Sequence, residues 1–133
     1  MVEAVQGASG SSSMGKNNTV LWVLQILVAV LFLMAGGAKL AGAAPMIAVY
    51  NTIGVGQWFR YVTGLIEVGS AALLVVPGLA AFGAGLLVCT MIGAVLTHVT
   101  ILHTSPAAPA ALLVVTAVIL WGRRGQMAAR LGR

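Results

Sequence analysis

Three ionisable side chains stand inside the apolar part of this sequence: Lys39, Glu67 and His98. Such a group at mid-bilayer depth costs about 2.5–3.5 kcal/mol on insertion scales, so it normally faces protein, water or a partner. Lys39 and Glu67 would lower each other's burial cost if they met. Histidine titrates nearest to neutral pH and is the candidate proton donor or acceptor. We therefore expect these three residues to form a polar cluster, with Arg60 and Thr97 as further candidates.

Simpler interpretations exist for several of these residues. Lys39 could extend to the headgroups at the membrane surface, and His98 could be an interfacial residue. His103 is expected in a loop, and its five-residue distance from His98 does not suit one helix face. Without a second cysteine or an aspartate, no metal site is expected. Because Cys89 is the single cysteine of the sequence, the chain cannot carry out dithiol chemistry by itself. We interpret Cys89 as a small packing residue.

The composition indicates lipid as the solvent. The chain has 133 residues, of which 60% are hydrophobic and 7% charged, whereas soluble domains carry about 25% charged residues. The net charge of +5 does not indicate nucleic-acid binding, because the basic residues form no groove-like array. Four arginines follow the last apolar run and are suited to anionic headgroups: Arg123, Arg124, Arg130 and Arg133.

Apolar periodicity and turn signals predict an all-α transmembrane four-helix bundle. Pro77-Gly78 separates the second run from the third, and HTSPAAP separates the third from the fourth. The expected spans are residues 20–40, 59–76, 79–102 and 107–121. The expected domains are a flexible tail (1–18), a membrane domain (19–122) and a basic cytoplasmic tail (123–133).

A short interfacial helix is expected between the first two spans. Pro45 can open it, and it would continue to about Thr52 before Gly54 ends it. It is too short to cross a bilayer. We expect it to lie at the membrane surface, with Tyr50 and Trp58 at headgroup level.

Residues at three- and four-residue spacing share one helix face, and these faces are expected to point inward. On the first span they are Gln25, Ala29, Phe32, Gly36 and Lys39. On the second they are Arg60, Thr63, Gly64, Glu67 and Ser70. On the third they are Gly85, Cys89, Gly93 and Thr97, and the fourth has Thr116 alone. Glu67 would lie about 12 Å inside the outer boundary, at 1.5 Å per residue.

Charge distribution predicts the orientation. Lys16 precedes the first span, and the arginines follow the last. An even number of spans puts both termini on one side, and positive residues mark the cytoplasmic side. We expect a multi-pass protein of the inner or plasma membrane with both termini in the cytoplasm.

Three segments together resemble the DoxX-like family of small bacterial membrane proteins. They are LFLMAGGAKLAG, GVGQWFRYVTGLIEVGSAALLV and GAVLTHV, and the resemblance covers roughly Leu21 to Trp121. It implies a four-helix membrane bundle. The family takes its name from a subunit of an archaeal membrane thiosulfate:quinone oxidoreductase, and related actinobacterial proteins are linked to redox-defence assemblies. The matched segments contain Lys39, Glu67 and His98.

These observations favour an accessory or anchor subunit of a quinone-linked membrane redox system, rather than an enzyme on its own. The expected partners are the lipid bilayer and either a redox enzyme or a second copy of the chain. Quinone is the expected ligand, and no covalently bound cofactor is expected. The alternatives are a non-enzymatic scaffold, a small-ligand or lipid-binding protein, and a proton-coupled small transporter. Small multidrug-resistance transporters carry their essential glutamate in the first span, whereas Glu67 lies in the second.

Overall fold

The computed structural model describes residues 2–130, and the surroundings of the side chains from 18 to 126. Its elements are α1 (Val2–Ala41), α2 (Ala44–Ile53), α3 (Gln57–Leu74), α4 (Ala80–Thr97), the π-helical turn η1 (His98–Leu102) and α5 (Ala107–Arg130). Residues 2–130 contain no strand, which confirms the all-α prediction.

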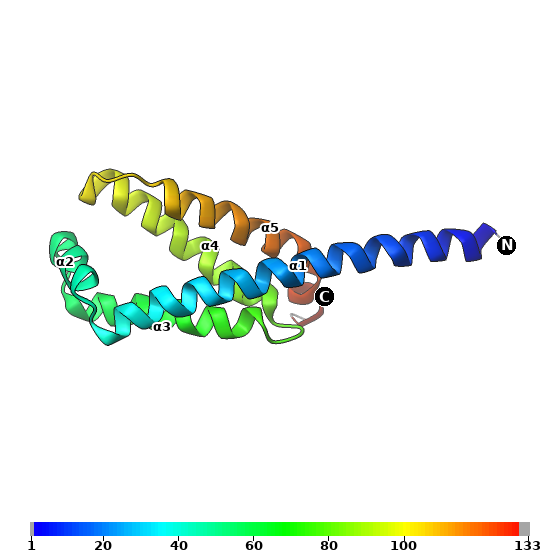
Figure 1. The fold of residues 1–133 in the computed structure, drawn as a ribbon, viewed down its shortest axis with the longest axis horizontal. Coiled ribbons are helices and arrows are strands. Elements are labelled where there is room, and N and C mark those ends of the chain that lie inside the picture. The colour runs from blue at the N-terminus through cyan, green and yellow to red at the C-terminus, as the bar shows by residue number, and fades with distance from the viewer. Residues whose placement is uncertain (1, 131–133) are drawn as a thin grey trace.

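Helix α1 is longer than expected. The sequence predicts a flexible tail over residues 1–18, but α1 begins at Val2 and has 40 residues. Its early part contains no proline, so nothing removes a donor from the helical hydrogen-bond ladder once the apolar part has nucleated it. This part projects beyond the other helices (Figure 1).

Three helical segments are long and apolar enough to cross a membrane: Asn18–Ala41, Ala80–Leu102 and Ala107–Gln126. They correspond to the first, third and fourth runs expected from the sequence. Helix α3, the second expected span, is not among them. It carries Gln57, Arg60 and Glu67 within 18 residues, and these lower its mean hydropathy.

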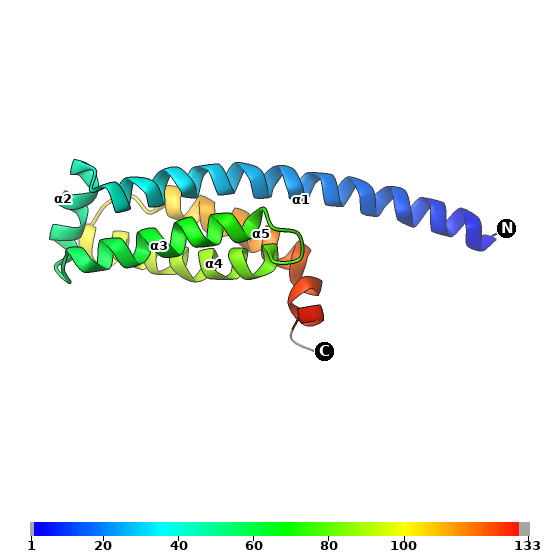
Figure 2. The same cartoon turned by 90° about the horizontal axis from the view of Figure 1, so that it is seen from below.

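The long helices lie in antiparallel pairs (Figures 1 and 2). Helix α1 lies beside α3, α4 lies beside α5, and contacts between α3 and α4 and between α1 and α5 join the pairs. Gly78, with φ of 85°, makes the turn between α3 and α4 that the Pro77-Gly78 pair predicts. Helix α2 crosses the end of the molecule opposite the start of α1 (Figure 2).

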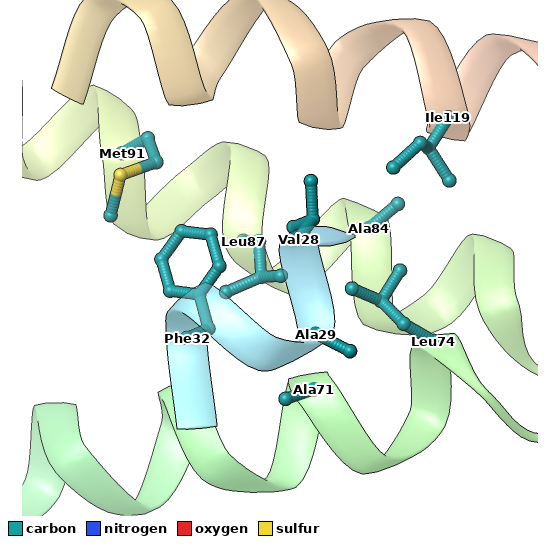
Figure 3. Close-up of a cluster of buried hydrophobic side chains, with 9 residues drawn as sticks. All are labelled: Val28, Ala29, Phe32, Ala71, Leu74, Ala84, Leu87, Met91 and Ile119. Carbon is teal, nitrogen blue, oxygen red and sulfur yellow. The ribbon is translucent and has the colours of Figure 1, made fainter. Parts of the chain in front are cut away.

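The hydrophobic core lies between the helix pairs (Figure 3). All four long helices contribute to it, and its buried members are Val28, Ala29, Phe32, Ala71, Leu74, Ala84, Leu87, Met91 and Ile119. Helices α3 and α4 approach closely beside it, because a Cβ on Gly83 would lie 2.6 Å from the carbonyl oxygen of Ser70. Only a glycine permits this contact.

Helix α2 has the boundaries that its sequence predicts. Pro45 lies in its first turn, and Gly54 ends it with φ of 83°. The side chain of Tyr50, which is expected at headgroup level, is buried within the protein. Its hydroxyl is 2.5 Å from Oγ1 of Thr63 on α3, and this hydrogen bond ties α2 down.

The inward faces expected for α1 and α3 are confirmed. Gln25, Ala29, Phe32 and Gly36 are buried on α1, and α3 buries Arg60, Gly64, Glu67 and Ser70. The face expected for the third span is wrong. Cys89 and Gly93 are exposed, and α4 instead buries Ala80, Ala81, Gly83, Ala84, Leu87 and Met91. Because α4 is apolar all round, spacing alone does not show which of its sides packs.

Candidate functional site

The structure brings Lys39 and Glu67 together near the end of the molecule that α2 covers. Lys39 Nζ lies 2.7 Å from Glu67 Oε1, with the two side chains 16% and 4% exposed. Burial of two opposite charges side by side makes their attraction much stronger than it would be in water. The pair therefore joins the end of α1 to the middle of α3.

Two glycines bring the backbones close enough for this contact. A Cβ on Gly36 would lie 2.9 Å from the carbonyl oxygen of Gly64, and a Cβ on Gly64 would lie 3.1 Å from that of Gly36. Lys39 and Glu67 each follow one of these glycines by three residues. Side chains on a helix lean towards its N-terminus. Because α1 and α3 are antiparallel (Figure 1), the two side chains lean towards each other.

The carboxylate of Glu67 keeps unused hydrogen-bonding capacity. Its Oε1 is buried 2.7 Å from Lys39 Nζ, and within the described residues no second donor contacts it. Oγ of Ser70, on the same face of α3, is also buried without a partner in this part of the chain. A buried polar atom without a hydrogen bond costs about 1–3 kcal/mol. A carboxylate oxygen can accept more than one hydrogen bond, so Glu67 can accept a further one from a ligand.

A cavity of about 510 Å³ adjoins the ion pair. Helices α2, α3 and α4 and the turn η1 form most of its wall, and Lys39 of α1 completes it. Most lining side chains are apolar, but the hydroxyl-bearing residues Tyr50, Thr63, Thr90 and Thr97 also line it. The volume falls within the usual range for small-molecule sites, about 300–1,000 Å³.

A second cavity of about 190 Å³ lies among α1, α4 and α5. Five residues line both cavities: Lys39, Glu67, Met91, Ala94 and His98. The ion pair therefore lies in the wall of both cavities, and both cavities are partly open.

His98 lies at the cavities but does not join the ion pair. Its Nδ1 is 2.6 Å from Oγ1 of Thr104, and no hydrogen bond joins it to Lys39 or Glu67 among the described contacts. His98 begins the π-helical turn, and His103 ends that turn with φ of 52°. Single π-helical turns occur often at functional sites. Here the turn places the His98 ring at the wall of both cavities.

Arg60 and Thr97 have local hydrogen bonds. Arg60 Nη1 donates to the backbone carbonyl of Lys39, and its Nε donates to Gln57 Oε1 at 2.7 Å. Arg60 thus caps the C-terminal end of α1, where a cation also suits the helix dipole. Thr97 Oγ1 donates to the Gly93 carbonyl at 2.7 Å, while the residue lines the larger cavity.

Sequence reasoning missed two features of the site. Cys89 is not a packing residue, because it is exposed and lines the larger cavity. Tyr50 reaches the same cavity from α2. The signal for Tyr50 is its position one turn before Gly54, which places it on the last turn of α2. No local pattern distinguishes Cys89 from a core residue.

A second polar cluster lies at the other end of the molecule. Gln25 Nε2 donates to the Leu74 carbonyl at 2.7 Å, and Arg123 Nε donates to Gln25 Oε1 at 2.7 Å. Arg123 Nη1 also donates to Asn18 Oδ1 at 2.8 Å. We call Asn18, Gln25 and Arg123 the distal cluster. The side chains of Arg130 and Arg133, expected to contact headgroups, lie outside the described residues.

The model of the DoxX-like family matches residues 23–121. The match includes Lys39, Glu67 and His98, and it covers well over half of the chain. Comparisons with curated proteins and with solved structures gave no match. The fold and family both fit a multi-pass membrane protein, and the chain belongs to the DoxX-like family.

Proposed function

We propose that α3 is a fourth membrane span, so that α1, α3, α4 and α5 form a transmembrane four-helix bundle. Its 18 residues have a length of about 27 Å. Its residues Arg60, Glu67 and Ser70 are buried, whereas Trp58 and Leu65 are exposed and line neither cavity. A helix that buries its polar face and exposes apolar side chains suits lipid as its solvent.

The proposed orientation has both termini in the cytoplasm and α2 at the outer surface of the inner or plasma membrane. Arg123 and Arg124 lie at the end of the last candidate span, Ala107–Gln126. The exposed Arg124 guanidinium stacks 3.9 Å from the Trp121 ring centre. Arginine and tryptophan together are typical of a cytoplasmic membrane interface. A cysteine introduced at Thr52, exposed on α2, should react with an impermeant thiol reagent added outside intact cells.

We propose that the larger cavity binds the headgroup of an uncharged, membrane-soluble ligand of the quinone type. The observation that carries this proposal is the buried Lys39–Glu67 pair in the wall of a mostly apolar cavity of about 510 Å³. An ammonium has three donors, so Lys39 can face Glu67 and still donate to a ligand carbonyl. The pair has no net charge, which favours an uncharged ligand over an anion.

Residues of the chain would bind the ligand and hold a proton, while a partner enzyme supplies the electrons. Lys39 would orient a ligand carbonyl, and the His98 ring at the cavity wall could hold a proton close to it. A bound quinone would supply the two-electron chemistry. The single cysteine leaves the chain without a dithiol pair of its own. The chain is thus proposed as the ligand-binding subunit of a membrane redox assembly.

Ligand binding is tested with the full chain in mild detergent and a chainless methylated benzoquinone as the probe. At a hundredfold excess over its Kd, a ligand stabilises the folded protein by about 2.7 kcal/mol, which should appear as a higher unfolding temperature. Lys39→Met and Glu67→Gln should weaken binding at least about tenfold, because each removes a charged hydrogen-bonding group.

Arg124→Gln is the matched control, since it removes a charge far from the cavity and should bind as the wild type does. If the wild type shows no shift, or if the Lys39 and Glu67 variants bind as well as the wild type, the proposed site is wrong. Stable variants with no ligand effect would instead support a purely structural pair. Separately, a gentle detergent pull-down should recover a redox enzyme with the chain, and recovery of the chain alone would contradict the partner proposal.

A further inference from the structure

The smaller cavity differs in chemistry from the larger one. Apart from the five residues that the two cavities share, its lining is entirely apolar: Leu31, Phe32, Ala35, Ala108, Pro109 and Leu112. A polar headgroup placed against these six residues would lose its hydrogen bonds with water and gain none, because the polar lining of the smaller cavity is confined to residues shared with the larger one. A hydrocarbon chain loses nothing in the same place.

The smaller cavity is also too small to be a separate site. Its volume of about 190 Å³ falls below the range of about 300–1,000 Å³ usual for small-molecule pockets. It lies against the same side chains as the larger cavity, and one of these is Met91. Methionine is unbranched and adaptable, so a ligand can displace its side chain at low cost.

We propose that the two cavities form one site for a ligand with a long hydrocarbon chain. The headgroup lies in the larger cavity, and the first part of the chain passes Met91 into the smaller cavity and leaves between α1 and α5. The ligand class is therefore a lipid-like quinone with an isoprenoid or similar tail, not a free small quinone. This inference depends on the headgroup site proposed above.

Two alanines on α5 allow a matched test. Ala108 lines the smaller cavity, whereas Ala111, also exposed and one helical turn further along, does not. Ala108→Phe should fill the chain path, and Ala111→Phe adds the same side chain outside it. Both positions are exposed, so neither substitution should prevent folding.

The measurement compares two probes in one detergent: a chainless benzoquinone, and the same headgroup with a two-isoprene chain. Ala108→Phe should weaken binding of the chain-bearing probe by about fivefold to a hundredfold, the usual effect of overfilling a packed site. It should leave the chainless probe within about twofold. Ala111→Phe should leave both unchanged, which also cancels any effect of partition into detergent.

The outcomes separate the two proposals. If Ala108→Phe leaves the affinity for the chain-bearing probe unchanged, the chain leaves by another route and this inference is wrong, while the headgroup site stands. Equal weakening of both probes would also overturn it, since the substitution would then act on the headgroup site. If neither probe binds to the wild type, the proposed function itself fails.

Discussion

The two polar clusters of this molecule lie at opposite ends and differ in how completely their groups are paired. In the distal cluster, Gln25 uses both its amide nitrogen and its amide oxygen, and Arg123 reaches Asn18 as well. At the other end, Lys39 Nζ is the one donor that contacts Glu67 Oε1 among the described residues. Both cavities adjoin the Lys39–Glu67 pair, and neither of them adjoins the distal cluster.

This difference shows that burial of polar groups does not by itself indicate function. Gln25 is as deeply buried as any residue of the core, yet its bonds connect α1, α3 and α5, and it lines neither cavity. The Lys39–Glu67 pair connects two helices and retains donors and acceptors beside open volume. Unused hydrogen-bonding capacity next to a cavity is the property that suggests binding.

The largest expected effect comes from separating α1 and α3 at the Lys39–Glu67 end. Gly36→Leu should destabilise the protein by about 3 kcal/mol, because the new side chain would overlap Val68 and the Gly64 backbone. Thermal unfolding in detergent measures this. Gly37→Leu is the matched control, since a Cβ at Gly37 meets nothing within 4 Å. Equal loss from both variants would show that the close approach does not matter.

A somewhat smaller loss is expected when the distal cluster is broken. Gln25→Leu leaves the Leu74 carbonyl and Arg123 without their partner, which should cost about 2 kcal/mol of unfolding free energy. Quinone affinity should stay within about twofold of the wild-type value, since Gln25 lies outside both cavities. A Gln25 variant of normal stability that fails to bind ligand would reverse the roles assigned to the two clusters.

Removal of charge from the Lys39–Glu67 pair should affect stability least among the cluster variants. Polar contacts between membrane helices contribute about 0.6 kcal/mol on average and at most about 1.7, so Glu67→Gln should lose no more than this. Its effect on ligand binding should be larger than that of Gln25→Leu. Unfolding curves and binding titrations on the same samples compare the two variants. A larger loss of stability in Glu67→Gln, or a larger loss of binding in Gln25→Leu, would contradict this prediction.

The smallest expected effect on the structure comes from chemical labelling of a cysteine in the cavity wall. Cys89 is exposed and lines the larger cavity, so a small membrane-permeant maleimide should label it without loss of fold. A bound quinone should slow this labelling several-fold by occupying the cavity. Gln25→Leu should label at the wild-type rate, because the distal cluster is remote from Cys89. If saturating ligand leaves the labelling rate of Cys89 unchanged, the ligand binds elsewhere.

Much of the helical layout could be predicted from the sequence. Long apolar runs determine helices in a low-dielectric solvent, since every backbone group must be paired within the segment. Pro45 and Gly54 determine the limits of α2, and Pro77-Gly78 determines the turn before α4, because these residues act through their own backbone geometry. The inward faces of α1 and α3 were also predictable, because polar residues mark one side of each helix.

Other features depended on contacts between helices. Helix α4 has no polar side, so only its packing against α3 and α5 decided that Met91 points inward and Cys89 does not. Arg60 was expected in the polar cluster, but its guanidinium donates to the Lys39 carbonyl at the end of α1 instead. The last carbonyl groups of a helix have no partner within the helix and therefore need such donors.

The sequence by itself therefore determined that the chain is helical and apolar, where its helices begin and end near prolines and glycines, and which few charged residues must find partners. Those properties follow from local backbone geometry and from the cost of charge in hydrocarbon. Only the tertiary structure decided that Lys39 meets Glu67, that His98 bonds to Thr104 instead, and that two cavities flank the pair. These depend on helix separation and rotation, which the Gly36–Gly64 contact sets, and local sequence pattern does not encode them.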